Sequence, residues 1–267
     1  RRERPVSEFD QARKHMVDSQ IRPSDVTDRR LIAAFLNTPR ELFVPRSRRA
    51  SAYADSQVVT SDNRTLMRPR DMAKLIHAAD IQPTDIVLDI ANGRGYSTAI
   101  LARVAETVVG VENDEDGLSR SAGLLSDIGA DNAVVVEGDP KAGVPKQGPF
   151  DVIFVNGSVD IVPDAWFDQL ANGGRLAVIV RKGPVGKATI FTKSEAGIGE
   201  RMNGPADYAL AYACFLLPWA VLELYLRACD SRAVAAKLGM AGVMLAAAGL
   251  TALGVFGAWM VIWSPHV

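Results

Sequence analysis

The chain has 267 residues, with 30 lysines and arginines against 31 aspartates and glutamates, and a formal net charge of −1 at pH 7. This balance does not favour a bulk polyanion as a partner, so we expect no nucleic-acid binding. Its two cysteines exclude a disulfide scaffold, and with three scattered histidines they predict no metal site. The length allows one full domain and a substantial appendage.

Residues 1–80 are expected to form a basic, largely helical segment. Residues 1–74 hold 16 lysines and arginines against 10 aspartates and glutamates. A solvated arginine surface explains the excess most simply, and an anionic lipid surface or an acidic partner is the alternative. Spacing predicts an irregular stretch from about 50 to 68, and helices at Phe9–Gln20, Asp28–Leu36 and Met72–Ala79.

Residues 81–200 alternate between apolar runs and helical patterns. Strands are predicted at Ile86–Ile90, Thr107–Glu112, Ala133–Glu137, Phe150–Val155 and Arg175–Val180. Helices are predicted at Ser97–Ala105, Asp116–Ile128 and Pro163–Leu170. This alternation predicts an α/β fold with a doubly wound, mostly parallel sheet, whose ligands bind at the carboxyl ends of the strands.

A glycine loop follows the first of these strands. Asp89 lies in the strand, Ala91, Gly93 and Gly95 lie in the turn that opens a helix, and Glu112 ends the next strand. A carboxylate at that spacing typically meets ribose hydroxyls, which indicates a nucleoside cofactor. A dinucleotide is the alternative, but its G-x-G-x-x-G spacing fits less well than the D-x-G-x-G-x-G pattern of S-adenosylmethionine enzymes.

Several segments resemble the protein-L-isoaspartate O-methyltransferase family over residues 9 to about 190. The resemblance rests on Pro39–Pro45 (P-R-E-L-F-V-P), Ala52–Tyr53, the glycine loop, Gly138–Asp139, Phe150–Ile153 and Gln169–Leu176. It implies a Rossmann-like methyltransferase fold, S-adenosylmethionine as methyl donor, and the α-carboxylate of isoaspartyl residues in damaged proteins as acceptor. It also implies that Asp89, Gly93 and Gly95 border the donor's amino-acid end, that Glu112 holds the ribose, and that Gly138 and Asp139 lie beside the adenine.

The chain departs from the family pattern at both ligand loops. Where the family has G-Q-T-I-S-x-P, this chain has Asn63-Arg64-Thr65-Leu66-Met67-Arg68-Pro69, so Met67 stands at the serine position expected near the acceptor carboxylate. Met67 cannot donate a strong hydrogen bond, so this contact is lost unless Thr65 or a backbone amide replaces it. Ala91 stands at the first glycine, where a methyl group strains any turn with positive φ. The family's last strands are expected to be missing after Lys193.

The last quarter of the chain predicts a membrane segment. Residues 238–263 contain no charge over a length that can cross a bilayer, and their small-residue faces suit a helix partner. Residues 201–237 are expected to form a linker and an interfacial helix, although Tyr208–Leu226 is an alternative second span. The basic linker before residue 238 favours a bacterial inner membrane with the soluble domain on the cytoplasmic side.

Two functions from different classes fit these features. The first is a degenerate accessory subunit of an inner-membrane protein complex, attached through the small-residue helix and the basic N-terminal face. The alternative is an active S-adenosylmethionine-dependent isoaspartyl carboxyl methyltransferase that acts near the membrane. The altered residues Met67 and Ala91 favour the accessory subunit slightly.

Overall fold

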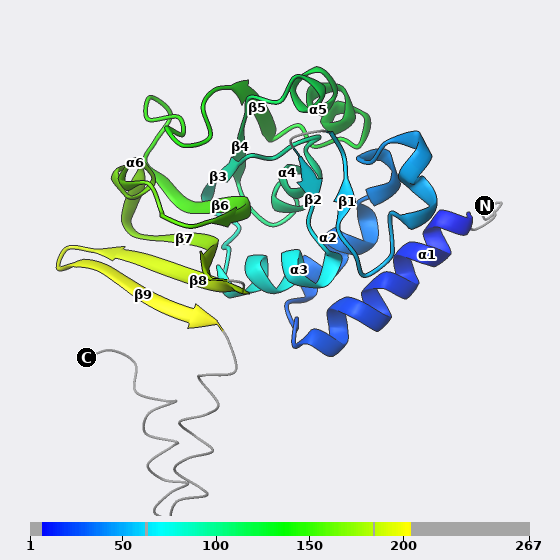
Figure 1. Ribbon diagram of the computed structural model, residues 1–267, viewed down its shortest axis with the longest axis horizontal. Coiled ribbons are helices and arrows are strands. Elements are labelled where there is room, and N and C mark those ends of the chain that lie inside the picture. The colour runs from blue at the N-terminus through cyan, green and yellow to red at the C-terminus, as the bar shows by residue number, and fades with distance from the viewer. Residues whose placement is uncertain (1–6, 62–63, 184, 204–267) are drawn as a thin grey trace, which may run out of the picture. The chain divides into compact units, whose positions relative to one another are not determined.

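A seven-stranded sheet forms the centre of the computed structural model, which describes residues 7–61, 64–183 and 185–203 (Figure 1). Its strands are β3 (Ile86–Ile90), β4 (Thr107–Glu112), β5 (Ala133–Glu137), β6 (Phe150–Val159), β7 (Leu170–Lys182), β8 (Val185–Ser194) and β9 (Gly197–Asn203). The strand order is β5-β4-β3-β6-β7-β8-β9. The five strands from β3 to β7 are parallel to one another. β8 pairs antiparallel with β7, and β9 pairs antiparallel with β8. The expected mostly parallel α/β sheet is therefore confirmed.

The helices of the described residues fall into an N-terminal group and a group between the strands. They are α1 (Glu8–Met16), α2 (Arg29–Asn37), α3 (Pro69–Ala78), α4 (Tyr96–Leu101), α5 (Glu115–Asp127) and α6 (Asp164–Asp168). A π-helical turn at Val17–Ile21 continues α1, and short 3₁₀ turns occupy Arg22–Ser24, Arg40–Leu42 and Arg46–Ser51. The side chain of Asp28 caps α2 by accepting from the amide of Arg30.

Two apolar clusters cover opposite faces of the sheet. Successive strand residues point to opposite faces, so Val87 belongs to one cluster and Leu88 to the other. The larger cluster packs the sheet against α2, α3, α4 and α5, and the smaller one packs it against Trp166 of α6. Both faces are covered, which explains why the central strands are continuous apolar runs.

The irregular segment after the second helix is more ordered than expected. Val58–Val59 (β1) and Thr65–Leu66 (β2) pair antiparallel as a small second sheet. The buried guanidinium of Arg40 donates to the carbonyl oxygens of Ala52 and Met67, both at 2.6 Å, and lies 4.9 Å from the ring centre of Tyr96. These contacts hold the segment against the first turn of α4.

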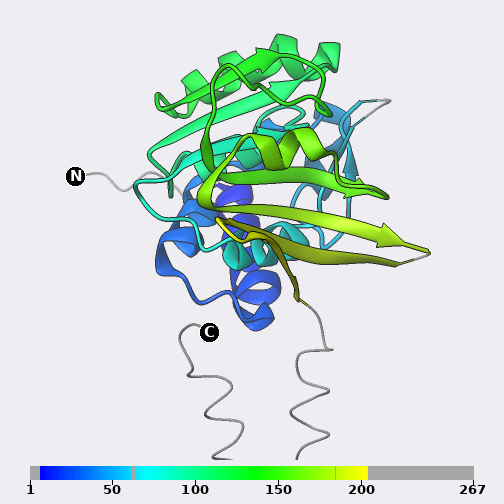
Figure 2. The ribbon, with the colours of Figure 1, turned by 90° about the vertical axis from the view of Figure 1, so that its left-hand side faces the viewer.

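The expectation that the family's last strands are missing is wrong. β8 pairs with β7 from Val185 to Thr192, and β9 returns along β8 after a turn at Glu195 and Ala196. Figure 2 shows these two long strands side by side at one end of the sheet. β8 is exposed over its first three residues and buries only the adjacent residues Thr189 and Ile190, so its apolar signal in the sequence is weak.

The chain divides into two units between residues 203 and 204, close to the predicted boundary between residues 200 and 201. The segments predicted to span or lie on a membrane, 208–226 and 238–263, fall outside the residues that the structure describes. Among the described residues, no helix is long and apolar enough to cross a membrane.

Candidate active site

The glycine loop lies at the point where the strand order reverses. From β3 the chain moves outward through β4 to β5, and it then returns to the other side of β3 with β6 and β7. The carboxyl ends of β3, β4 and β6 therefore meet beside the loop at Ala91–Gly95. Ligands of doubly wound sheets bind at this switch point, so the glycine loop lies where this fold class binds its ligands, and its role as the site stays a prediction.

Three residues of the loop have left-handed backbone conformations. The φ angles are 56° at Ala91, 55° at Gly93 and 91° at Gly95. Glycine adopts such angles without penalty, whereas the Cβ of alanine meets the following carbonyl oxygen and costs about 1–2 kcal/mol. The turn therefore requires the positive φ at which the methyl group of Ala91 is strained.

Asp89 is buried at the centre of a hydrogen-bond network. Its Oδ2 accepts from the hydroxyls of Ser97 and Thr98, both at 2.7 Å, and its Oδ1 accepts from Nδ2 of Asn156 at 2.5 Å. Burial raises the pKa of Asp89 to about 7, although the three hydrogen bonds oppose that shift. The network joins β3, α4 and β6 and fixes the start of the loop.

Glu112 is fully buried at the end of β4. Its Oε2 accepts from the amide of Gly93 at 2.6 Å, and its Oε1 accepts from the amides of Asn113 at 2.8 Å and Asp114 at 2.9 Å. Arg64 donates to both oxygens. Burial alone raises the pKa of Glu112, but the hydrogen bonds from Arg64 and these amides outweigh it, so the pKa lies below its usual value and the group is ionised.

The two residues predicted for the acceptor side face different surroundings. Thr65 is exposed and lines a small cavity of about 20 Å³ beside the glycine loop, together with Phe43, Thr60, Ala91 and Tyr96 among others. Met67 is only 6 % exposed, and its side chain belongs to the larger apolar cluster rather than to that cavity. The structure therefore brings Thr65, and not the Met67 side chain, to the loop.

Gly138 and Asp139 lie at the end of β5, next to Glu112. The amide of Gly138 donates to the carbonyl oxygen of Glu112 at 3.0 Å, and a Cβ at Gly138 would approach Val111 to 3.0 Å. Asp139 is exposed and its carboxylate accepts from the amide of Lys141 at 3.0 Å. Asp89, Ala91, Gly93, Gly95, Glu112 and Gly138 are thus gathered around one edge, with Asp139 at its rim. The roles assigned to all of them stay predictions.

Three further residues of the site were not singled out from the sequence. Arg64 contacts Glu112, Asn156 contacts Asp89, and Asn92 lies in the loop with a buried Oδ1 that has no hydrogen-bond partner among the described residues. Asn156 directly follows the predicted strand Phe150–Val155, so the rule that sites form at strand ends was sufficient to find it. No sequence signal places Arg64 against Glu112, because the contact depends on how the segment before β2 folds back.

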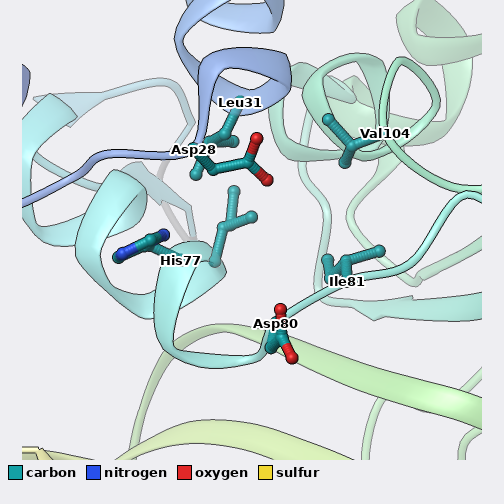
Figure 3. A pocket seen from close by; sticks show the side chains of 7 residues that line it. Asp28, Leu31, His77, Asp80, Ile81 and Val104 are labelled. Carbon is teal, nitrogen blue, oxygen red and sulfur yellow. The ribbon is translucent and has the colours of Figure 1, made fainter.

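A second cavity lies at the other end of β3. It has about 40 Å³, room for a water or two, and is lined by Asp28, Leu31, Ile76, His77, Asp80, Ile81 and Val104 (Figure 3). Asp80 and Ile81 precede β3, so this cavity is at the opposite end of the strand from the glycine loop. Ligands of doubly wound sheets bind at the carboxyl ends of the strands, so the place of this cavity does not favour it as the site of a nucleoside cofactor.

An arginine-lined cavity adjoins the glycine loop. It has about 590 Å³ and shares Arg94 with the cavity beside Thr65. Arg94 pairs with Asp116 of α5 through contacts of 2.5 and 3.0 Å. The other arginines that line it are Arg46, Arg49 and Arg120. Within the described residues, no group of His, Cys, Asp and Glu is arranged to hold a metal ion.

Comparison with known proteins agrees with this geometry. The model of the protein-L-isoaspartate(D-aspartate) O-methyltransferase family matches residues 11–204. The chain is 37% identical over 173 residues to a protein-L-isoaspartate O-methyltransferase of Roseiflexus castenholzii, covering 65% of this chain and 79% of that protein. It is 35% identical over 185 residues to the protein-L-isoaspartate O-methyltransferase of Koribacter versatilis, covering 69% of this chain and 83% of that protein.

Solved structures show the same fold. A protein-L-isoaspartate O-methyltransferase superposes with a TM-score of 0.63 at 30% identity, covering 72% of this chain and 63% of that chain. A Plasmodium falciparum protein assigned to the same enzyme class superposes with a TM-score of 0.60 at 20% identity, covering 72% of this chain and 94% of that chain. Its structure is a complex with S-adenosyl-L-homocysteine. The fold is that of Rossmann-like S-adenosylmethionine methyltransferases. This chain belongs to the protein-L-isoaspartate(D-aspartate) O-methyltransferase family.

Proposed function

We propose that the chain is an active S-adenosylmethionine-dependent methyltransferase that esterifies the α-carboxylate of isoaspartyl residues in proteins. The observation that carries this proposal is the pair of buried carboxylates, Asp89 and Glu112, at the ends of the adjacent strands β3 and β4. Burying two acidic groups in one site costs free energy unless they bind a ligand or other groups of the protein. Their presence therefore favours a functional binding site over one that has lost its function.

The site residues fit the polar groups of a nucleoside donor. Glu112 is an ionised acceptor for ribose hydroxyls, since its pKa is lowered. The buried Oδ1 of Asn92 lacks a partner among the described residues and is an acceptor for the donor's ammonium group. The amides of the glycine loop approach the same edge. S-adenosylmethionine would supply an activated methyl group on its sulfonium.

The acceptor requires little chemistry from the protein. A carboxylate is ionised at neutral pH and is its own nucleophile, so the work left to this chain is to align it and to exclude water. Thr65 is exposed beside the glycine loop and is the nearest candidate to hold the acceptor carboxylate with its hydroxyl. Met67 is buried, so it takes no part in that contact through its side chain.

The proposal is tested by assaying the full-length chain with methyl-labelled S-adenosylmethionine and two peptides that differ only in an isoaspartyl or an ordinary aspartyl residue. Base-labile label should enter the isoaspartyl peptide alone. Glu112→Gln should lower this transfer at least tenfold through weaker donor binding, whereas Glu137→Gln, at the exposed end of β5, should leave it unchanged. Absence of transfer by a folded wild-type chain would overturn the proposal and favour the accessory subunit.

We also propose membrane attachment, with the soluble domain on the cytoplasmic side of a bacterial inner membrane and residues 238–263 as the span. The uncharged length of that segment supports the span, and the arginine-lined cavity supports an acidic partner within a membrane complex. In sealed vesicles that expose the cytoplasmic side, protease should digest the soluble domain and spare an epitope added after Val267. Digestion of both would instead indicate a two-helix hairpin.

A further inference from the structure

The guanidinium of Arg64 covers the carboxylate of Glu112. Nε of Arg64 lies 3.0 Å from both Oε1 and Oε2, and one terminal nitrogen lies 2.5 Å from Oε1 and 2.7 Å from Oδ1 of Asn113. The side chain of Glu112 is fully buried and that of Arg64 is 21% exposed, so Arg64 forms the solvent-facing cover of this group.

These contacts fill the acceptor capacity of Glu112. Each oxygen of a carboxylate accepts about two hydrogen bonds. Oε2 already receives the amide of Gly93 and Nε of Arg64, and Oε1 receives the amides of Asn113 and Asp114 besides Arg64. Ribose hydroxyls reach a carboxylate by donating to it, so they cannot bind Glu112 while Arg64 holds this position.

Arg64 lies outside the seven-stranded sheet. Arg64 lies between β1 and β2, which pair over two residues each. Next to it, the hydroxyl of Ser61 donates to Asp114 at 3.0 Å, and the amide of Thr60 donates to the carbonyl oxygen of Arg64 at 2.9 Å. Moving the Arg64 side chain therefore disturbs no central strand of the large sheet.

On the basis of the donor site of the proposed function, we propose that Arg64 is a gate. Arg64 competes with the donor's ribose for Glu112, so the donor binds only when Arg64 is displaced. Only the fraction of molecules with Arg64 displaced binds the donor, and the apparent affinity is lowered by that fraction. The segment around Arg64 stands where the family resemblance has G-Q-T-I-S, and a glutamine at this place lacks the charge and the fork of donors that hold Glu112 here.

The gate is tested by titrating the full-length chain with S-adenosyl-L-homocysteine in a calorimeter. Arg64→Gln should bind about five- to a hundredfold more tightly than the wild type, the range of ordinary coupling between sites. Arg68→Gln is the matched control, because Arg68 is on the same segment but pairs with Asp71 at 2.8 Å, and its affinity should equal that of the wild type. Equal or weaker binding by Arg64→Gln would overturn the gate.

The outcomes also separate the gate from the proposed function. Methyl transfer by the wild type with no gain of affinity in Arg64→Gln refutes the gate alone. Binding by Arg64→Gln with none by the wild type supports the gate and removes the proposed activity. Absence of binding in both refutes both, since there is then no donor site to compete for.

A second measurement covers the case in which Arg64→Gln does not fold. In the wild-type chain, S-adenosyl-L-homocysteine should speed hydrogen exchange at the amides of Thr60 and Thr65, because displacement of Arg64 loosens the pairing of β1 with β2. The amide of Val108, which lies on β4 and donates to the carbonyl oxygen of Asn132 at 3.0 Å, is the internal control and should not exchange faster. Slower or unchanged exchange at Thr60 and Thr65 upon binding would contradict displacement.

Discussion

Asn156 donates its side-chain amide to Asp89 across the two central strands, at 2.5 Å from Nδ2 to Oδ1. The same nitrogen lies 2.8 Å from the hydroxyl oxygen of Ser97, which itself donates to Asp89. A buried carboxylate at the switch point is thereby held by a neighbour on β6 as well as by the helix that follows its own loop. The network makes the geometry of the loop depend on the charge of Asp89.

Stability should fall with rising pH because of Asp89. Its pKa is raised to about 7 in the folded chain, against 3.8 for an ordinary aspartate, so the folded chain holds a proton that the unfolded chain releases between these values. The contribution of Asp89 to the free energy of unfolding is fully present below pH 4 and is lost as the pH rises through 7. It amounts to about 4 kcal/mol, at ~1.4 kcal/mol per pKa unit. Urea unfolding at pH 5 to 8 measures this slope.

Asp89→Asn should flatten that slope, because the amide does not titrate, while Asp131→Asn at an exposed position should keep it. Comparing slopes between variants cancels the contributions of all other titratable groups, which the variants share. A wild-type stability that rises between pH 5 and 7 while Asp89→Asn stays parallel to it would contradict the raised pKa.

Ala91→Gly should stabilise the chain. Ala91 has a φ of 56°, and glycine removes the left-handed strain of about 1–2 kcal/mol while it adds up to about 1 kcal/mol of entropy to the unfolded chain. The expected net gain in the free energy of unfolding is about 0.5–1 kcal/mol, measured by urea titration. Ala99→Gly, in the middle of α4, is the matched control and should lose about 1 kcal/mol. A loss at both positions would show that Ala91 is not strained.

The central strands were predictable and the last hairpin was not. β3 and β4 begin and end at the predicted residues, because strands covered on both faces are unbroken apolar runs. β5, at the edge of the sheet, also has the predicted bounds, because its run of valines marks a strand although it is only partly buried. β8 and β9 mix polar and apolar residues at the end of the sheet, where half of the surface is exposed, and this pattern resembles a loop.

The candidate site also has a part that could be predicted from the sequence and a part that could not. Asp89 and Glu112 were predictable because strand ends carry function in this fold class. The contact of Arg64 with Glu112 could not be predicted, because these residues are 48 positions apart and no local preference decides the path of the irregular segment that carries Arg64.

Met67→Ser should destabilise the chain rather than restore an acceptor contact. The Met67 side chain packs in the larger apolar cluster at 6 % exposure, so serine leaves a cavity and buries a hydroxyl, at a cost of about 2–4 kcal/mol in the free energy of unfolding. Met67→Leu keeps the volume and should cost less than about 1.5 kcal/mol. Urea titration of both variants measures the difference. Stability equal to the wild type in Met67→Ser, with higher methyl transfer, would show that this side chain turns toward the acceptor.

Arg40→Ala should be the most destabilising of these changes. Arg40 is fully buried, and its guanidinium holds the carbonyl oxygens of Ala52 and Met67 while it stacks on Tyr96. Alanine leaves both oxygens without these partners and opens a large cavity, which predicts a loss of about 3–5 kcal/mol in the free energy of unfolding, measured by urea titration.

Arg48→Ala is the control for Arg40→Ala, because Arg48 lies nearby in the chain and is exposed, and it should change stability by less than about 0.5 kcal/mol. Because Arg40 anchors the segment that carries Arg64 and Thr65, its loss should also weaken donor binding in whatever fraction remains folded. A stable Arg40→Ala chain with normal donor affinity would show that the segment is positioned by its own hairpin instead.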